Sequence, residues 1–481
     1  MTDSRFPSGA ASCLGQFWRP GETTDRRTGV VRVAESRVEL EVSPGLTPTW
    51  VSRQLADGRV ATSRAPDPND MVVLGSISAR PSLVSLWDLS TRQRQSIGIP
   101  VPGTDQPESH KMVGHWCLVG AHLPDSKTTF LGVRLDIGNL TEWAWLPGID
   151  FEYVLGSDRL TWSYDTTVDD DDARLPSNEG YMTLGPELSM TFPDIHGTKL
   201  TTFASLEAEL VQGWTLSECF GRFVTPLSTL MTLLSGESCR ARSLSVWTEQ
   251  DGWIDIHGRG IEPESPAKCG ELLLHREQAG LDFFSNWLSI HRQVSPVPQI
   301  LAATVRKELP TIEAEALSLV TAMEALHRIL DPAAKRFSNA EVDAAVRSLA
   351  TSEVPATIRK SFIDALGLWW PEYSYPMRVK ALAEPVSAAV PKCVGHLNRW
   401  KAAVVEQRVS LAHGLGTNGL TADLALQMVA LNRSIRWMLL IRLLLLAKVP
   451  ADVLRVATDQ SEDFQRDHRL CREQWPRIFA N

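Results

Sequence analysis

The sequence of 481 residues contains no apolar run long enough to span a membrane. Its most apolar run, Trp437 to Val449, is interrupted by Arg442 and falls short of the ~20 apolar residues that a membrane-spanning helix needs. The first residues, MTDSRFPSGAASCLGQF, have no continuous apolar stretch of the kind that signal peptides carry. These absences predict a cytoplasmic protein without a membrane partner, in which the apolar run forms a buried core helix.

Paired cysteines are also missing. The seven cysteines are odd in number and none belongs to a Cys-x-x-Cys pair, which disfavours both a disulfide framework and a zinc site. Cys393 and His396 have a ligand-like spacing, but no second pair of ligands accompanies them. The successive aspartates Asp169–Asp172 lack the alternation and the glycine of a calcium loop, so their segment, Ser163–Gly180, is expected to be a solvated loop. We therefore expect no metal and no cofactor.

The net charge of −9 would disfavour a nucleic-acid partner, but the charge is unevenly distributed. Residues 355–481 carry 17 Lys+Arg against 11 Asp+Glu, a net charge of +6, whereas the preceding residues carry −15. Arginine outnumbers lysine by 37 to 11, and guanidinium groups match phosphate oxygens bidentately. The positive charge and the arginine excess therefore indicate that the C-terminal part binds a phosphate-containing partner. A GC-rich coding bias explains the arginine excess equally well.

Residues 1–200 show the pattern of a β-rich domain. RVELEV, from Arg37 to Val42, alternates charged and apolar residues, and FLGVRLDI, from Phe130 to Ile137, repeats the pattern. Further short apolar segments lie between Gly, Pro and Asp residues. This spacing predicts an antiparallel sandwich or a partly closed barrel.

Residues 201–269 are expected to extend that domain by a helix and a hairpin. Leu216–Gly236 has helical spacing, with Pro226 at a possible kink. Ser243–Gly258 is expected to form the hairpin, and Asp251-Gly252 suits the positive φ angles of a tight type I′ turn.

From about residue 270 to residue 460 the apolar period becomes helical, which predicts a bundle, and residues 461–481 are expected to form a tail. One amphipathic helix covers Thr311–Leu330, with Glu324 at the edge of its apolar stripe. Ser338 and Glu341 form a capping box at the start of another helix. Thr421 is the expected N-cap of a last long helix that Pro450 stops. The expected fold class is therefore α+β and multidomain, with antiparallel strands followed by an all-α part.

A helix in this bundle ends in RVSLAHGLG, Arg408 to Gly416. Five residues on a regular helix turn through about 500°, so Arg408 and His413 would point ~140° apart. The two glycines that follow His413 supply a helix end at which the side chains could converge. The alternative is that Arg408 is a surface residue and His413 a polar C-cap. For Glu324, an ion pair at the helix edge is the alternative to a catalytic role.

The C-terminal part resembles a HEPN domain of the ApeA-like branch. HEPN nucleases carry Arg-x(4–6)-His, and in that branch an Ala-Glu pair in an early helix, here within AMEALHRIL, precedes a segment like RVSLAHG. The N-terminal part resembles the β-rich domain of ApeA-type anti-phage proteins, with GQFWRPG, GVVRV, VVLGSIS, HWCLVGAHL and LTEWAW in that order. One departure is Val409, which stands where the superfamily commonly has a polar residue; Ser410 or Glu324 would have to supply that group.

The resemblance implies a metal-independent endoribonuclease that cuts tRNA or mRNA in abortive infection. Arg408, His413 and Glu324 are its catalytic candidates, and Ser410, Arg433 and Arg436 its substrate-binding candidates. An arginine suits the phosphorane oxygens, and a histidine suits the transfer of the 2′-OH proton. The resemblance also implies a homodimer through the HEPN domain, and an N-terminal domain that senses a phage protein or restrains the nuclease. The alternative is a non-catalytic HEPN scaffold whose β-rich domain binds a phage protein or nucleic acid.

Overall fold

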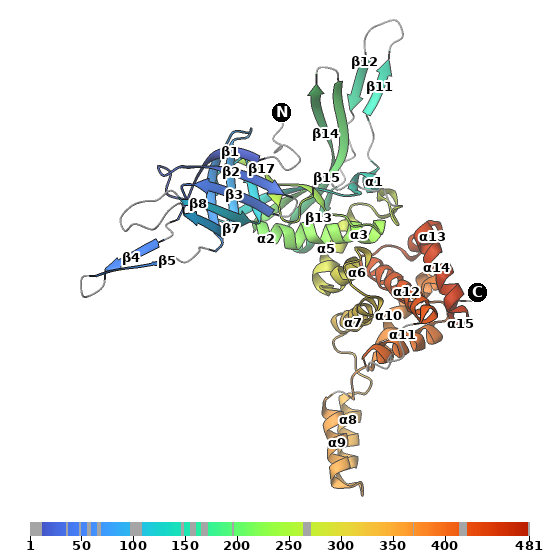
Figure 1. Cartoon of the computed structure of the whole chain (residues 1–481). Helices are drawn as coiled ribbons and strands as arrows, with labels where there is room; N and C mark the ends of the chain where they lie inside the picture. The colour runs from blue at the N-terminus through green and yellow to red at the C-terminus, as the bar shows by residue number, and fades with distance from the viewer. Residues whose placement is uncertain are drawn as a thin grey trace. The chain divides into compact units, whose positions relative to one another are not determined.

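The computed structural model describes residues 12–34, 37–47, 50–54, 59–64, 69–96, 108–145, 149–153, 160–164, 172–194, 197–262, 271–368, 370–412 and 421–479. The chain divides into two compact units. The first comprises Met1–Met231 and Cys239–Cys269, and the second comprises Thr232–Ser238 and Gly270–Asn481. Strands dominate the first unit and helices the second, so the predicted order of a β-rich part and an all-helical part is confirmed (Figure 1).

Six antiparallel strands of the first unit close into a barrel, and the central member is the long strand β7. The first half of β7 pairs with β6 and its second half pairs with β8, while β1, β2 and β3 complete the circle. The barrel strands are β1 (Ser12–Trp18), β2 (Arg27–Ala34), β3 (Arg37–Ser43), β6 (Met71–Ile77), β7 (Leu83–Ser96) and β8 (Glu108–Gly114). Of the two arrangements expected from the alternating pattern, the barrel is the one that forms.

The sheet continues beyond the barrel because the first half of β7 also pairs with β9. From β9 the order runs through β17, β16, β10, β15 and β14 to β13. Two further pairs form separate ribbons, β4 with β5 and β11 with β12. The bounds are β4 (Trp50–Gln54), β5 (Val60–Arg64), β9 (Trp116–Val119), β10 (Thr129–Ile137), β11 (Ile149–Tyr153), β12 (Leu160–Tyr164), β13 (Asp172–Arg174), β14 (Gly180–Asp194), β15 (Gly197–Thr215), β16 (Ala241–Thr248) and β17 (Gly252–Gly258), with the short helix α1 (Leu140–Ala144) after β10.

Two of these strands bear on the sequence-based expectations. β15 runs through position 200, so the sheet does not divide between residues 200 and 201. Of the aspartates expected in a solvated loop, Asp172 begins the short strand β13, and Asp169–Asp171 lie outside the described residues.

The helix expected at Leu216–Gly236 consists of two α-helical pieces joined by a wider turn. α2 (Leu216–Cys219) passes into a π-helical turn, η2 (Phe220–Val224), and then into α3 (Thr225–Ser235). Pro226 begins α3 at its second position. A proline has no N–H to donate and its ring crowds the preceding turn, and a π-helical turn relieves that crowding.

The β16–β17 hairpin forms as expected, but its type I′ turn was wrong. Thr248 pairs with Gly252, which leaves a loop of three residues, and only Gly252 within the turn has a positive φ, of 73°. Asp251 does not have a positive φ, and its backbone N–H donates to the Thr248 hydroxyl at 3.0 Å. This is the geometry of a three-residue loop closed by a glycine in the left-handed region.

The second unit is a helical bundle built around α12, a helix of 25 residues that includes most of the apolar run. No helix in the described ranges is long and apolar enough to cross a membrane, and the run is buried inside the bundle as expected. The helices are α4 (Arg276–Ala279), α5 (Asp282–Val294), α6 (Val297–Val305), α7 (Ile312–Leu330), α8 (Asn339–Ala350), α9 (Ala356–Leu368), α10 (Tyr375–Ala389), α11 (Leu397–Ala412), α12 (Ala422–Leu446), α13 (Ala451–Gln460), α14 (Glu462–Gln474) and α15 (Pro476–Phe479), with the 3-10 turns η1 (Pro176–Asn178) in the first unit and η3 (Pro391–Cys393) in the second.

The helix starts follow the predicted capping chemistry. The Thr421 hydroxyl accepts the Leu424 N–H at 3.3 Å, and Ser338 and Glu341 form the expected capping box. In the segment expected as a tail, 461–481, Ser461 caps α14, and the helices α14 and α15 pack against the bundle. Phe464 and Cys471 are spaced by seven residues on one face of α14 and are buried, which is the period of a packed helix.

We expect Gly75→Ala to destabilise the barrel. Gly75 lies opposite the fully buried Phe17, and a methyl group there would lie 2.6 Å from the Phe17 ring and 2.9 Å from a Val84 methyl. Overpacking of this kind costs about 1–3 kcal/mol of the free energy of unfolding, measurable by chemical denaturation of the full chain. Gly185→Ala in β14 is the matched control, since nothing lies within 4 Å of its added methyl. Equal stability of the two variants would contradict the packing argument.

Candidate functional site

The described part of the Arg-x4-His motif, residues 408–412, is the last described part of α11. The described part of that helix runs to Ala412, one residue before His413, and the helix end expected at the glycines lies outside the described residues. Arg408 is in the last described turn. His413, Gly414 and Gly416 lie outside the described residues, and the approach of His413 to Arg408 stays a prediction.

Arg408 is held between two residues from other helices. Its Nη2 donates to Glu324 Oε2 on α7 at 3.1 Å, and its guanidinium carbon lies 4.4 Å from the centre of the Tyr375 ring at the start of α10. The Arg408 side chain is 38% exposed and that of Glu324 is 26% exposed, so water reaches the pair. Two of the catalytic candidates, Arg408 and Glu324, are therefore in contact, and the charge–aromatic stacking orients the guanidinium.

Tyr375 is fixed by its own contacts. Its hydroxyl donates to the Val320 carbonyl at 3.4 Å. Burial raises the pKa of Tyr375, and the charge of Arg408 partly opposes that rise. The phenol therefore stays protonated at neutral pH and acts as a donor, while its ring supports the arginine.

Glu324 links Arg408 to a row of further charged groups. Its Oε1 accepts from Arg328 at 3.2 Å, and Arg328 also bonds Glu372 at 3.2 Å. Glu372 in turn bonds the buried Arg378 at 3.0 Å. This Arg408 cluster alternates positive and negative charges over α7, α11 and the start of α10, so each of its three guanidinium groups contacts at least one of two shared carboxylates.

The cluster ends at a neutral histidine. Arg378 Nη1 lies 3.4 Å from His327 Nδ1, and the ring of Tyr373 packs beside His327. Burial lowers the pKa of His327, and the neighbouring Arg378 lowers it further. Because a guanidinium only donates, Nδ1 must accept and the proton of the neutral ring is on Nε2.

Sequence reasoning missed Tyr375, Glu372, Arg378 and His327 as members of this cluster. His327 and Arg328 follow Glu324 at the spacing that places residues on one helix face, which was a local signal. Tyr375 and Arg378 approach only through the packing of α10 on α7, which no local pattern specifies.

The two other predicted arginines belong to a second cluster on α12. Arg436 bonds Asp467 at 2.9 Å, with side chains only 14% and 6% exposed, and Trp437 Nε1 donates to the same carboxylate. Arg433 and Arg436 both lie near Glu315, whose pKa is raised by burial and lowered by these arginines. Arg436 is thus committed to a buried carboxylate, a structural role.

A hydrogen bond joins the helices that carry the two clusters. Gln407 Nε2 donates to Asn432 Oδ1 at 2.8 Å, and each residue directly precedes an arginine, Arg408 or Arg433. Ser410 and Val409 are both exposed, and Val409 is 40% exposed. Val409 and Ser410, the two residues that follow Arg408, are therefore accessible to a partner.

The cysteines give no support to a metal site. Cys393 is buried, and burial raises the pKa of its thiol. Within the described ranges, no group of three or more His, Cys, Asp or Glu residues is arranged to hold an ion.

We predict that Asp467→Ala will lower the free energy of unfolding by about 3 kcal/mol, because it leaves the Arg436 guanidinium and the Trp437 N–H without their buried acceptor. Denaturant titration of the full chain measures this. Asp463→Ala is the control on the same helix, since Asp463 pairs with Arg466 at the surface, where the loss is at most ~1 kcal/mol. A loss for Asp467→Ala no greater than that of the control would show that the buried pair is not needed.

Residues 12–287, more than half of the chain, match the family model of ApeA N-terminal domain 1. The match covers the β-rich unit and extends into α5, and the Arg408 cluster lies beyond it. No curated protein and no solved structure matches the chain. The family suggests anti-phage defence. The chain belongs to the ApeA N-terminal domain 1 family.

Proposed function

We propose that the chain is a metal-independent endoribonuclease of anti-phage defence, and that Arg408 and His413 form its active site. The observation that carries the proposal is the position of Arg408, half-exposed in the last described turn of α11 and supported by Glu324 and Tyr375. A partly exposed arginine held in a fixed orientation suits recognition of a phosphate.

The chemistry uses the nucleophile that RNA itself carries. The 2′-oxygen attacks phosphorus and the bond from phosphorus to the 5′-oxygen breaks, which leaves a 2′,3′-cyclic phosphate. His413 is the residue to accept the 2′-OH proton or to donate one to the leaving oxygen, because its ordinary pKa lies near neutral pH. Arg408 stabilises the negative charge that develops on the phosphorane oxygens.

Glu324 orients Arg408 and leaves most of its N–H donors available. The guanidinium has five N–H donors, and the bond to Glu324 runs from Nη2, so other donors remain to face a phosphate. The bond from Arg328 to the second oxygen of Glu324 holds the carboxylate in place. We infer that Glu324 positions Arg408, whereas His413 transfers protons.

Two features of the proposal come from the family resemblance. A homodimer would bring two copies of the motif together, and the exposed Val409 beside Arg408 is suited to contact a second copy. The β-rich unit would sense a phage protein or restrain the nuclease until infection. The substrate would be tRNA or mRNA, with tRNA favoured, and the protein would act in the cytoplasm.

One observation favours the alternative, a scaffold without nuclease activity. The departure at Val409 removes the polar group that commonly follows the arginine, and the charge of Arg408 is already compensated by Glu324. In that case the helical unit would only dimerise, and the β-rich unit would bind a phage protein or nucleic acid. RNA cleavage by the purified protein separates the two readings.

We predict that Arg408→Ala and His413→Ala will each lower the rate of RNA cleavage by at least ~100-fold, the loss typical of removing one group that stabilises a transition state. Glu324→Gln should give a smaller loss, because a neutral amide still accepts a hydrogen bond from Arg408. Lys401→Ala on α11 is the control and should cleave normally. Near-normal cleavage by Arg408→Ala would remove this residue from the site.

We predict that the cleavage persists in EDTA and that the products carry 2′,3′-cyclic phosphate ends, as attack by the 2′-OH requires. Incubation of the full chain with total RNA, followed by enzymatic analysis of the termini, measures both features. Loss of activity in the chelator, or products with 5′-phosphate and 3′-OH ends, would contradict this mechanism.

A further inference from the structure

The helices α8 and α9 form a hairpin that extends away from the other helices of its unit (Figure 1). We call residues 337–370 the arm. Its root is closed by a hydrogen bond of 2.6 Å from the Arg336 N–H to the Pro371 carbonyl, and by the bridge between Lys335 and Glu372. In the described part of α8 and α9, Leu366 is the one buried side chain. The arm thus lacks a core of its own.

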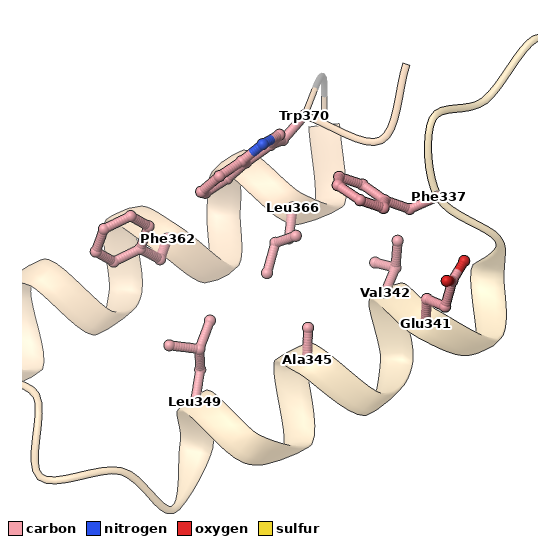
Figure 2. Close-up of a pocket in the computed structure, with 8 residues that line it drawn as sticks. All are labelled: Phe337, Glu341, Val342, Ala345, Leu349, Phe362, Leu366 and Trp370. Atoms are coloured by element: carbon pink, nitrogen blue, oxygen red, sulfur yellow. The ribbon is translucent and has the colours of Figure 1, made fainter. Parts of the chain in front are cut away.

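The two helices face each other across an open groove, not a packed seam (Figure 2). The groove has a volume of about 510 Å³. Its lining comprises Phe337, Glu341, Val342, Ala345, Leu349, Phe362, Leu366 and Trp370. The single charged member, Glu341, is engaged by Ser338 in the capping box, so the surface that it offers to an occupant is apolar.

The exposed apolar surface of α9 includes the groove-lining Phe362 and two side chains outside the groove, Ile358 and Leu368. Ile358 is 49% exposed, Phe362 is 40% exposed and Leu368 is 73% exposed. Three large apolar side chains on one short helix cost free energy while they stay in water, at ~25 cal/mol per Å² of apolar surface. Exposed apolar surface of this kind, rimmed by charged residues, is typical of an interaction site.

The charges on the two helices of the arm are sorted by position, and Glu353, in the loop at the tip, is the exception. The halves of α8 and α9 nearest the root carry only acidic residues, Glu341, Asp343 and Asp364. The halves nearest the tip carry only basic residues, Arg347, Arg359 and Lys360. Arg359 donates to the Ala350 and Ser352 carbonyls at the end of α8, but the other basic side chains project from the helices.

We propose that the arm is an interface with a second copy of this chain, and that two arms pack groove to groove in antiparallel fashion as a four-helix bundle. The distribution of charge on the arm favours a second copy of the chain as the partner. An antiparallel two-fold arrangement places the acidic root of each arm against the basic tip of the other, and both contacts are attractive. A parallel arrangement would place acid on acid and base on base.

The same geometry fills the groove. In an antiparallel pair, α8 lies on the second α8 and α9 on the second α9, so the exposed Phe362 and Ile358 of each copy enter the space between the helices of the other. Four helices that share one apolar core are a stable arrangement, whereas two helices are not enough to bury both of their apolar faces. A small apolar ligand would fill the groove but would not use the charges.

The test measures self-association of the full chain by sedimentation over a dilution series. We expect Phe362→Asp to raise the dissociation constant at least ~tenfold, which corresponds to about 1.4 kcal/mol. Asp343→Lys with Asp364→Lys, and separately Arg347→Glu with Lys360→Glu, should weaken association to a similar extent. The variant with all four changes should associate like the unchanged chain, because its charges are reversed at both ends. The two charge variants should also associate with each other when mixed.

Val456→Asp on α13 is the matched control, since Val456 is 51% exposed and lies outside the arm. Far-UV circular dichroism checks that every variant keeps its helices. The proposal is overturned if all the variants self-associate equally, or if the unchanged chain is a monomer at every concentration. It is also overturned if the variant with four changes does not recover association. RNA cleavage plays no part in this readout. Because a homodimer through the motif face would also self-associate, the arm is tested by the difference between the arm variants and the unchanged chain.

Discussion

The helical unit depends on the burial of α12, which is apolar on almost every side and must be surrounded. The helices α5, α6, α7, α10 and α14 pack on it. Its few polar side chains then have to find partners, because an unpaired buried polar group is costly. Ser434 binds both Trp400 and the Cys393 carbonyl, and Asn432 binds Gln407. Two of these bonds join α11 to α12, and one of them comes from Gln407, the neighbour of Arg408.

The position of Arg408 therefore follows from a packing constraint and not from the motif alone. α11 packs on α7 and α10 and is joined to α12 by two hydrogen bonds, and α7 and α10 bring Glu324 and Tyr375 to the guanidinium. Because the surrounding charges alternate in sign, the cluster holds the partly exposed side chain of Arg408 in a defined orientation. A phosphate group would then meet a donor whose orientation is already set, which lowers the entropy cost of binding. This is the physical basis for the proposed RNA site.

Local chemistry predicted much of this structure. The stripe of α7, the caps at Ser338 and Thr421 and the alternation in β3 and β10 depend on neighbours in sequence, and each forms as expected. What could not be predicted depends on distant contacts. Closure of the barrel needs β7 to pair with both β6 and β8, and Tyr375 reaches Arg408 only when α10 packs on α7. The helices α14 and α15 were missed because their many charged residues outnumber the few buried ones, such as Phe464 and Cys471.

Binding of a non-cleavable RNA tests most directly the claim that Arg408 recognises a phosphate. The RNA carries 2′-O-methyl groups, and its dissociation constant is measured against salt concentration for the unchanged chain and for Arg408→Ala. The account predicts weaker binding by the variant, together with a salt dependence reduced by ~0.7 in logarithmic slope for each phosphate that the variant no longer neutralises. The same affinity and the same slope for both proteins would show that Arg408 does not bind the RNA backbone.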